Sequence, residues 1–405
     1  MNNNERTERT DEIAKEISLK VGYFGIGNAG SQIGLEIYKH GVSVKIANTS
    51  VKDLHGKLIP EDIEAFLIED NMAQSRGAGR NRKTAKLIYK EWNNSTLMFK
   101  NEEFVKWLSS LDIILVGSST AGGTGSGLSI PIAYQISSMF PAKVVILVSV
   151  LPRLSESVTC QKNTIDYFKE LESANTKVNI PYMVYDLEKY ATKNADEAYD
   201  LISKDIAEAA SILAGSMSKI TENGMIDERD LLTAITAPGY MTVYTGKKVD
   251  LNKIEGEGIQ SIITKSIKTS SVCQHQRDKI SGYFAMFLDI QDESDDPVKK
   301  NDFSTLTEHF GRPLDIFVNM SINNGSFSSY GLIVSGLSIP ADRLNACDEI
   351  VSEYEDCRKE KSYDLADVAA KHTALGENKQ LDKLLGSSST KAIDITNIDM
   401  PDDLL

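Results

Sequence analysis

Glycine and hydroxyl residues crowd into the segment Thr120–Gly127, whose sequence is TAGGTGSG. An apolar run at residues 112–118 precedes it, and a helical pattern follows from residue 128. A buried strand that ends in a glycine-rich turn before a helix presents free backbone N–H groups, and such groups bind phosphate. Glycine also admits the positive φ angles of such a turn and leaves room for the ligand. The segment therefore predicts a phosphate site, to which Thr120, Thr124 and Ser126 add hydroxyl donors.

A second glycine-rich loop, Gly25–Ser31, lies between a predicted strand at residues 19–24 and a predicted helix at residues 31–40. It sits at the same kind of strand-to-helix junction as the first. Two such loops can hold a polyphosphate from both sides, so the pair indicates a nucleotide site more strongly than either loop does alone.

The second loop also matches the G-x-G-x-x-G pattern of dinucleotide-binding proteins. That pattern needs an acidic residue at the end of the next strand to bind a ribose hydroxyl. Here the strand at residues 42–47 continues into Asn48, Thr49 and Ser50, and the first acid after them is Asp53. An NAD-dependent oxidoreductase is disfavoured, but it remains an alternative.

Two carboxylates, Asp227 and Asp230, stand three residues apart where a helix is expected to begin. At this spacing they can share one helix face. They could order a water molecule while Mg²⁺ neutralises a polyphosphate. An aspartate at this place is also an ordinary helix N-cap. The two roles are compatible, and both stay open.

Strand and helix patterns alternate through the first half of the chain, which predicts a parallel sheet covered on both faces. Ligands bind at the carboxyl ends of the strands in such sheets, where both glycine loops fall. The strands are expected at residues 19–24, 42–47, 112–118, 143–150 and 181–186, and a long helix at residues 195–220.

The second half predicts a smaller α+β domain and a C-terminal helical segment. Strands are expected at residues 283–290, 314–322 and 330–338, and helices at residues 258–271 and 303–310. The predicted units are an N-terminal helical extension (1–18), a nucleotide-binding domain with the long helix (19–222), a catalytic loop with the α+β domain (223–341), a helical segment (342–385) and a flexible acidic tail (386–405). Residues 394–405 carry four acids and no bases, which is typical of a disordered segment.

Composition narrows the function classes. The 405 residues carry a net charge of −14, which argues against direct binding to nucleic acid. The four cysteines have no CxxC spacing and the histidines no metal-ligand spacing, so free thiols in a reducing cytoplasm are expected and no metal ligand is assigned. No apolar run approaches 18 residues, so no membrane span or membrane partner is expected.

With Ala121 in place of its first glycine, TAGGTGSG resembles the G-G-G-T-G-[ST]-G motif of the tubulin/FtsZ superfamily of GTPases, and the order of elements agrees over about residues 19–345. The resemblance implies GTP or GDP with Mg²⁺ as ligands. It implies that Gly77, Ala78 and Gly79 form a loop that closes over the γ-phosphate, that Glu156 contacts the ribose, and that Asp186 and Tyr199 contact guanine. The implied phosphate loops are made of Gly25, Gly27, Asn28, Ala29, Gly30, Ser31, Asn48, Thr120, Ala121, Gly122, Gly123, Thr124, Gly125 and Ser126.

The segment Ile226–Asp230 resembles the catalytic loop N-x-D-x-x-[DE] of the superfamily, with Met225 at the asparagine position. The resemblance implies that Asp227 and Asp230 are catalytic and that they complete the site of the next subunit in a head-to-tail filament. A head-to-tail interface that does not close gives an open polymer.

The short linker, the C-terminal helix and an N-terminal helix at residues 6–17 resemble the TubZ group of this superfamily. That resemblance implies segregation or positioning of plasmid or phage DNA, with the tail binding a DNA-bound adaptor protein. An FtsZ-like cell-division GTPase is an alternative, because residues 399–401 and the final two leucines resemble an FtsZ tail peptide. A non-catalytic scaffold is another, because Ser50, Tyr199 and Met225 depart from the family pattern.

Overall fold

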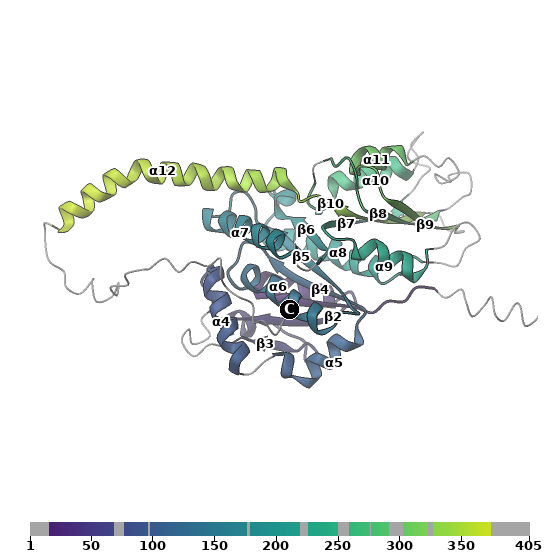
Figure 1. Ribbon diagram of the computed structural model, residues 1–405, viewed down its shortest axis with the longest axis horizontal. Coiled ribbons are helices and arrows are strands. Elements are labelled where there is room, and N and C mark those ends of the chain that lie inside the picture. The colour runs from purple at the N-terminus through teal and green to yellow at the C-terminus, as the bar shows by residue number, and fades with distance from the viewer. Residues whose placement is uncertain are drawn as a thin grey trace, which may run out of the picture.

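The computed structural model describes residues 16–68, 77–95, 98–175, 179–218, 226–249, 259–275, 277–290, 303–322 and 327–373. The described strands form one ten-stranded sheet in the order β3-β2-β1-β4-β5-β6-β7-β10-β8-β9 (Figure 1). The N-terminal helical extension, the linker and the acidic tail fall wholly or mostly outside these ranges, as does Met225.

The N-terminal half of the sheet is parallel, as predicted. Its strands are β1 (Val21–Ile26), β2 (Ser43–Asn48), β3 (Ala65–Leu67), β4 (Ile113–Ser119), β5 (Val144–Leu151) and β6 (Tyr182–Asp186). Its helices are α2 (Gly27–Tyr38), α3 (Val51–His55), α4 (Arg82–Ser95), α5 (Glu102–Ser110), α6 (Thr124–Met139), α7 (Val158–Asn175) and α8 (Ala195–Leu213), with short 3₁₀ turns η1 (Met98–Lys100) and η2 (Leu187–Tyr190). Every residue of β4, β5 and β6 is buried, as expected for strands covered on both faces.

The C-terminal half continues the same sheet with mixed strand directions. Its elements are α9 (Glu228–Thr236), β7 (Tyr240–Val249), α10 (Ile259–Thr269), β8 (Tyr283–Ile290), α11 (Ser304–Phe310), β9 (Asp315–Ile322), β10 (Ser328–Leu337) and α12 (Ala341–Thr373). Figure 1 shows α10 and α11 on one face of these strands and α9 on the other. The sequence patterns predicted β8, β9 and β10 but missed β7, which joins β6 through the pair Tyr182 and Tyr240.

Helix α8 runs along the parallel strands, from their carboxyl ends to their amino ends. At its start, the Arg153 guanidinium, just beyond the carboxyl end of β5, donates to the carbonyl of Asn194 over 3.1 Å. At its end, the carbonyl of Ala214 accepts from the N–H of Leu19, just before β1, over 3.0 Å. Nineteen residues of α-helix span about 28 Å. The start of α8 therefore lies at the carboxyl ends of the parallel strands, here called the carboxyl edge of the sheet. The end of α8 lies at their amino ends, here called the amino edge.

All four cysteines are free thiols, as predicted: Cys160, Cys273 and Cys347 are buried and Cys357 is exposed. In the described ranges no helix is both long enough and apolar enough to cross a membrane.

The imidazole of His275 is half-buried against aromatic rings of the C-terminal half. The ring of His275 stacks on Phe310, with centroids 5.1 Å apart and planes 5° apart, and the ring of His309 meets it edge-on at 5.7 Å. Burial, followed by the neighbouring His309, lowers the pKa of His275, Asp278 opposes the shift, and the resulting pKa is about 4. The folded protein therefore holds this side chain neutral.

The half-buried imidazole of His275 makes the free energy of unfolding depend on pH. An unfolded histidine titrates near 6.5, so between about pH 6.5 and pH 4 the unfolded chain binds the extra proton. The contribution of His275 is fully present above that window and is lost as the pH falls through it. His275→Phe keeps the ring stack, and we expect its free energy of unfolding to fall less steeply over this window in urea titrations. The exposed His40→Gln variant is the control. Equal slopes for His275→Phe and wild type would contradict the assignment.

Candidate functional site

The two glycine loops touch each other at the carboxyl edge of the sheet. Strands β1 and β4 are neighbours, so the turns that follow them lie side by side. A Cβ on Gly27, whose φ is +76°, would lie 2.8 Å from the amide nitrogen of Gly125. A Cβ on Gly125 would lie 2.9 Å from the carbonyl oxygen of Ile26. Only glycine at both positions allows this approach, and the predicted pairing of the loops is confirmed.

The end of β2 joins the same cluster. The hydroxyls of Thr49 and Thr124 are hydrogen-bonded at 2.6 Å. The Asn48 amide donates to Asp53 at 3.4 Å, while the hydroxyl of Ser50 accepts from the Asp53 N–H at 3.2 Å. Ser50, which stands where the superfamily has an acid, therefore serves here as the N-cap of α3.

The loop at residues 77–81 closes against TAGGTGSG through left-handed backbone. The φ angles of Gly77, Gly79 and Arg80 are +88°, +58° and +61°. A left-handed arginine is strained, and such strain is concentrated at functional sites. A Cβ on Gly123 would lie 2.7 Å from the N–H nitrogen of Asn81, so the two loops meet backbone to backbone.

Asn163, which sequence reasoning missed, holds these two loops together. This α7 side chain is buried, and its amide nitrogen lies 2.9 Å from the carbonyl oxygen of Arg80, 2.8 Å from that of Ala121 and 3.3 Å from that of Gly122. The only sequence signal is a polar residue on the buried face of an amphipathic helix.

The cluster surrounds an open space suited to an anion. Helices α3, α5, α8 and α9 begin with a side-chain cap, whereas α2 and α6, which follow the two glycine loops, make no side-chain cap bond within the described chain. Their first N–H groups and positive dipole ends are therefore available to a ligand. A Cβ built on Gly122 meets no described atom within 4 Å, so this glycine faces the open space.

The hydroxyl donors predicted in the segment Thr120–Gly127 have hydrogen-bond partners within the protein. Thr120 is buried and bonds the Thr164 hydroxyl at 2.8 Å, and Ser126 donates to the Gly122 carbonyl. These side chains fix the loop, so backbone N–H groups are its main donors. Among the described residues the Ser31 hydroxyl, in the first turns of α2, is buried with no hydrogen-bond partner.

Glu156 and Tyr199, the predicted ribose and base contacts, lie beside the loop Thr120–Gly127. The Tyr199 hydroxyl lies near the side chain of Ser119, the residue just before TAGGTGSG. Burial raises the pKa of Tyr199 to about 12, and the charge of Glu156 raises it as well. Glu156 in turn accepts from the Arg153 N–H at 3.0 Å. Tyr199 and Glu156 thus form a wall next to the anion space.

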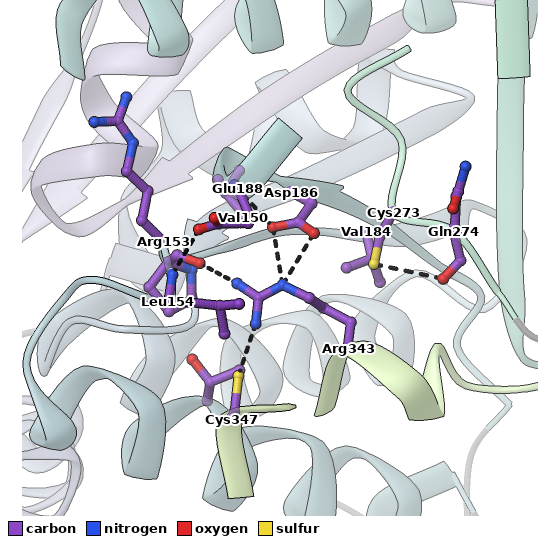
Figure 2. A network of polar contacts seen from close by, with 12 residues as sticks. Val150, Arg153, Leu154, Val184, Asp186, Glu188, Cys273, Gln274, Arg343 and Cys347 are labelled. Carbon is purple, nitrogen blue, oxygen red and sulfur yellow. Dashed lines mark hydrogen bonds and ion pairs between the residues drawn. The ribbon is translucent and has the colours of Figure 1, made fainter. Parts of the chain in front are cut away.

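Asp186, the other predicted base contact, is bound elsewhere. Its carboxylate accepts from the Arg343 guanidinium at 3.0 and 3.2 Å and from the Glu188 N–H at 3.0 Å (Figure 2). Burial raises its pKa, and Arg343 opposes the shift. Guanine recognition by Asp186 stays a prediction, and the contacts shown give this side chain a structural role.

Asp227 and Asp230 form the predicted cap of α9. The Asp227 carboxylate accepts from the Asp230 N–H at 2.8 Å, and Asp230 accepts from the Asp227 N–H at 3.3 Å. The chain reaches α9 after Ser218, whose hydroxyl accepts from the Ile17 N–H, and leaves it toward Tyr240, which pairs with the first residue of β6. The described residues on either side of α9 in the chain, Ser218 and Tyr240, thus lie at the amino edge of the sheet, opposite the anion space.

Comparisons with known proteins agree with this arrangement. Residues 20–182 match the model of the tubulin/FtsZ family GTPase domain. A curated relative, the tubulin-like protein TubZ of Clostridium botulinum C phage, is 26% identical over 229 residues, which cover 56% of this chain and 57% of the relative. The match thus spans little more than half the length of that protein.

Solved structures show the same fold. Clostridium botulinum phage c-st TubZ with a truncated C-terminal tail superposes with a TM-score of 0.63 at 20% identity, over 83% of this chain and 98% of that one. CetZ2 from Haloferax volcanii, described as a GTPγS-bound protofilament, gives a TM-score of 0.66 at 15% identity, over 84% and 100%. The predicted resemblance to the tubulin/FtsZ superfamily, and within it to the TubZ group, is confirmed.

Gly122 and Gly123 are adjacent but have different surroundings: Gly123 packs against a neighbouring loop, whereas Gly122 faces the open space. A Cβ on Gly123 clashes with the loop at residues 77–81, so Gly123→Ala should lose about 1–3 kcal/mol of stability and lower the melting temperature. A Cβ on Gly122 points into open space, so Gly122→Ala should melt like wild type but bind nucleotide more weakly. Thermal melts and equilibrium binding of a fluorescent GDP analogue test this. A Gly122→Ala variant with wild-type affinity would show that the open space is not the phosphate site.

Proposed function

We propose that this chain, whose residues 20–182 match the tubulin/FtsZ family GTPase domain, is a GTPase that assembles head to tail into filaments. One observation carries the proposal. The anion space lies at the carboxyl edge of the parallel strands, whereas Ser218 and Tyr240, which flank α9 in the chain, lie at the amino edge. Asp227 and Asp230, at the start of α9, would then be remote from a nucleotide bound to the same chain and would meet one on a copy stacked end to end.

The phosphates of GTP would bind at the uncapped starts of α2 and α6. Gly25, Gly27 and Gly30 with Asn28, Ala29 and Ser31 would supply the first half of the site, and the segment from Thr120 to Ser126 the second half. Asn48 and the loop Gly77–Gly79 would lie beside the terminal phosphate. Glu156 and Tyr199 would form the wall for the ribose and base. The family match favours this reading over a dinucleotide site.

Mg²⁺ fits this site as a companion of the nucleotide. Among the described residues no group of three or more His, Cys, Asp or Glu side chains could hold a metal ion. Magnesium commonly binds through substrate phosphates and water with few protein ligands, and Asp53 with Asn48 is the nearby polar pair at the end of β2. When bound, the ion would neutralise charge on the phosphates.

Hydrolysis would need a water molecule ordered at the γ-phosphate by the carboxylates of the neighbouring subunit. The reciprocal cap of α9 fixes the backbone of both aspartates and leaves further acceptor sites on each carboxylate. The same cap is the specific observation that favours a non-catalytic scaffold, because it gives both aspartates a purely structural use.

We propose that the filament segregates or positions plasmid or phage DNA in the cytoplasm, as the resemblance to the TubZ group implies; the curated relative bears the TubZ name and comes from a phage. The acidic tail, residues 386–405, would bind a basic, DNA-bound adaptor protein by charge complementarity. An FtsZ-like role in cell division is the alternative for the same filament.

Mixing two inactive variants tests the shared site. Asp230→Asn keeps the cap geometry and the pocket but loses a carboxylate, and its GTPase rate should fall at least about 100-fold. Gly122→Asp places a negative charge in the anion space and should not bind GTP. In an equal mixture about one interface in four pairs an intact pocket with intact aspartates, so up to about a quarter of the wild-type rate should return.

The control for this mixture carries both substitutions on one chain. Asp230→Asn mixed with the Gly122→Asp, Asp230→Asn double variant contains no intact aspartate pair and should stay inactive. A mixture of the two single variants that stays equally inactive, although both assemble with wild type, would rule out catalysis between subunits. Normal turnover by Asp230→Asn alone would remove Asp230 from the mechanism.

Protein concentration gives an independent readout. Because each site needs two subunits, the specific GTPase rate should be near zero below a threshold concentration and rise steeply above it. Light scattering in the presence of GTP should show filaments appearing at the same threshold. A specific rate that does not change with concentration would indicate a site complete within one chain. GTP binding without turnover at every concentration would support the scaffold.

A further inference from the structure

The guanidinium of Arg343 lies between the carboxyl ends of strands β5 and β6. The residue lies in the first turn of α12, and its side chain is 9% exposed. Its guanidinium donates to the carboxylate of Asp186, the last residue of β6, and to the carbonyl of Pro152, which follows β5 (Figure 2). A third donor reaches the Cys347 sulfur at 3.1 Å. One side chain of α12 therefore ties the carboxyl ends of β5 and β6 together.

These strand ends lead directly to the wall beside the anion space. From Pro152 the chain passes to Arg153, whose guanidinium donates to the carbonyls of Tyr190, Lys193 and Asn194 at 3.2, 2.9 and 3.1 Å. Asn194 is the N-cap of α8, and α8 carries Tyr199. The Arg153 contacts therefore fix where this helix begins.

A second route leaves from Asp186. Its carboxylate accepts from the Glu188 N–H, and the Glu188 carboxylate accepts from the Leu154 N–H at 2.8 Å. Leu154 is two residues before Glu156, so both members of the wall are reached from Arg343 through short hydrogen-bonded steps.

Helix α12 is otherwise attached to the body along one side. It packs on α7, and Figure 1 shows its far half extending past the rest of the protein. An exposed ion pair, Lys162 with Glu355 at 3.6 Å, lies farther along this contact. Val351 is buried, whereas residues 352–359 are exposed. The buried end of α12 at Arg343 is thus the part that can affect the site.

We propose that Arg343 is a positioning residue for the nucleoside part of the ligand: it holds the Pro152–Glu156 loop and the start of α8 so that Glu156 and Tyr199 face the ribose and base. The inference rests on the proposed function. It makes the affinity for the nucleoside depend on how α12 is docked, while the phosphate loops, which Arg343 does not contact, stay as they are.

Competition against a fluorescent GDP analogue, at protein concentrations below assembly, tests this role. Arg343→Lys keeps the charge but loses the planar fork that reaches Asp186 and Pro152 together. Its affinity for GDP should fall about tenfold, the equivalent of one charge-assisted hydrogen bond. Its affinity for pyrophosphate, which has no nucleoside, should fall much less, so the advantage of GDP over pyrophosphate decreases. Lys162→Ala, which loosens α12 away from this network, should keep both affinities.

A second variant guards against loss of the fold. Arg343→Gln keeps a planar hydrogen-bond donor and leaves Asp186 in place, its melting temperature shows whether it is folded, and it should show the same loss of affinity for GDP. Wild-type affinities in both folded variants, or an equal loss for GDP and pyrophosphate, would overturn the positioning role. A wild-type protein that binds no GDP would instead overturn the proposed function itself.

Discussion

The contact between Gly27 and Gly125 is the constraint on which the rest of the site depends. Neighbouring parallel strands bring their following turns within reach, but only turns without side chains can touch backbone to backbone. That contact aims the free starts of α2 and α6 at one space. Every other element of the site is placed relative to this pair: the end of β2 through Thr49, the loop at residues 77–81 through Gly123, and α7 through Asn163.

Features encoded locally could be predicted from the sequence, and features made by distant segments could not. The glycine loops, the parallel strands and the cap at Asp227 each depend on residues close in the chain, and all appear in the structure. Strand β7 was missed because Gly246 and two lysines interrupt its pattern; Gly246 is needed because a Cβ there would meet the Tyr330 ring at 2.1 Å. Asn163 and Arg343 were missed because their partners lie about 40 to 190 positions away.

The aspartates show how one local motif can serve two purposes. A reciprocal cap needs one carboxylate oxygen from each residue, which leaves the remaining oxygens for water or a neighbouring molecule. The cap also rigidifies the carboxylates, which lowers the entropy cost of holding them toward a substrate. The structural role is therefore compatible with the catalytic role that we propose, and conservative substitutions are needed to separate them.

The described chain starts at the amino edge of the sheet, beside the far end of α8. Ile17 bonds Ser218, and a Cβ on Gly215 would lie 2.6 Å from Ile17. The described chain therefore enters the fold opposite the phosphate loops, at the edge that the proposed head-to-tail contact would use. For anyone labelling this protein, a dye attached at Ile17, Gly215 or Ser218 would disturb that edge and leave the nucleotide site unchanged, so these positions report on assembly rather than on binding.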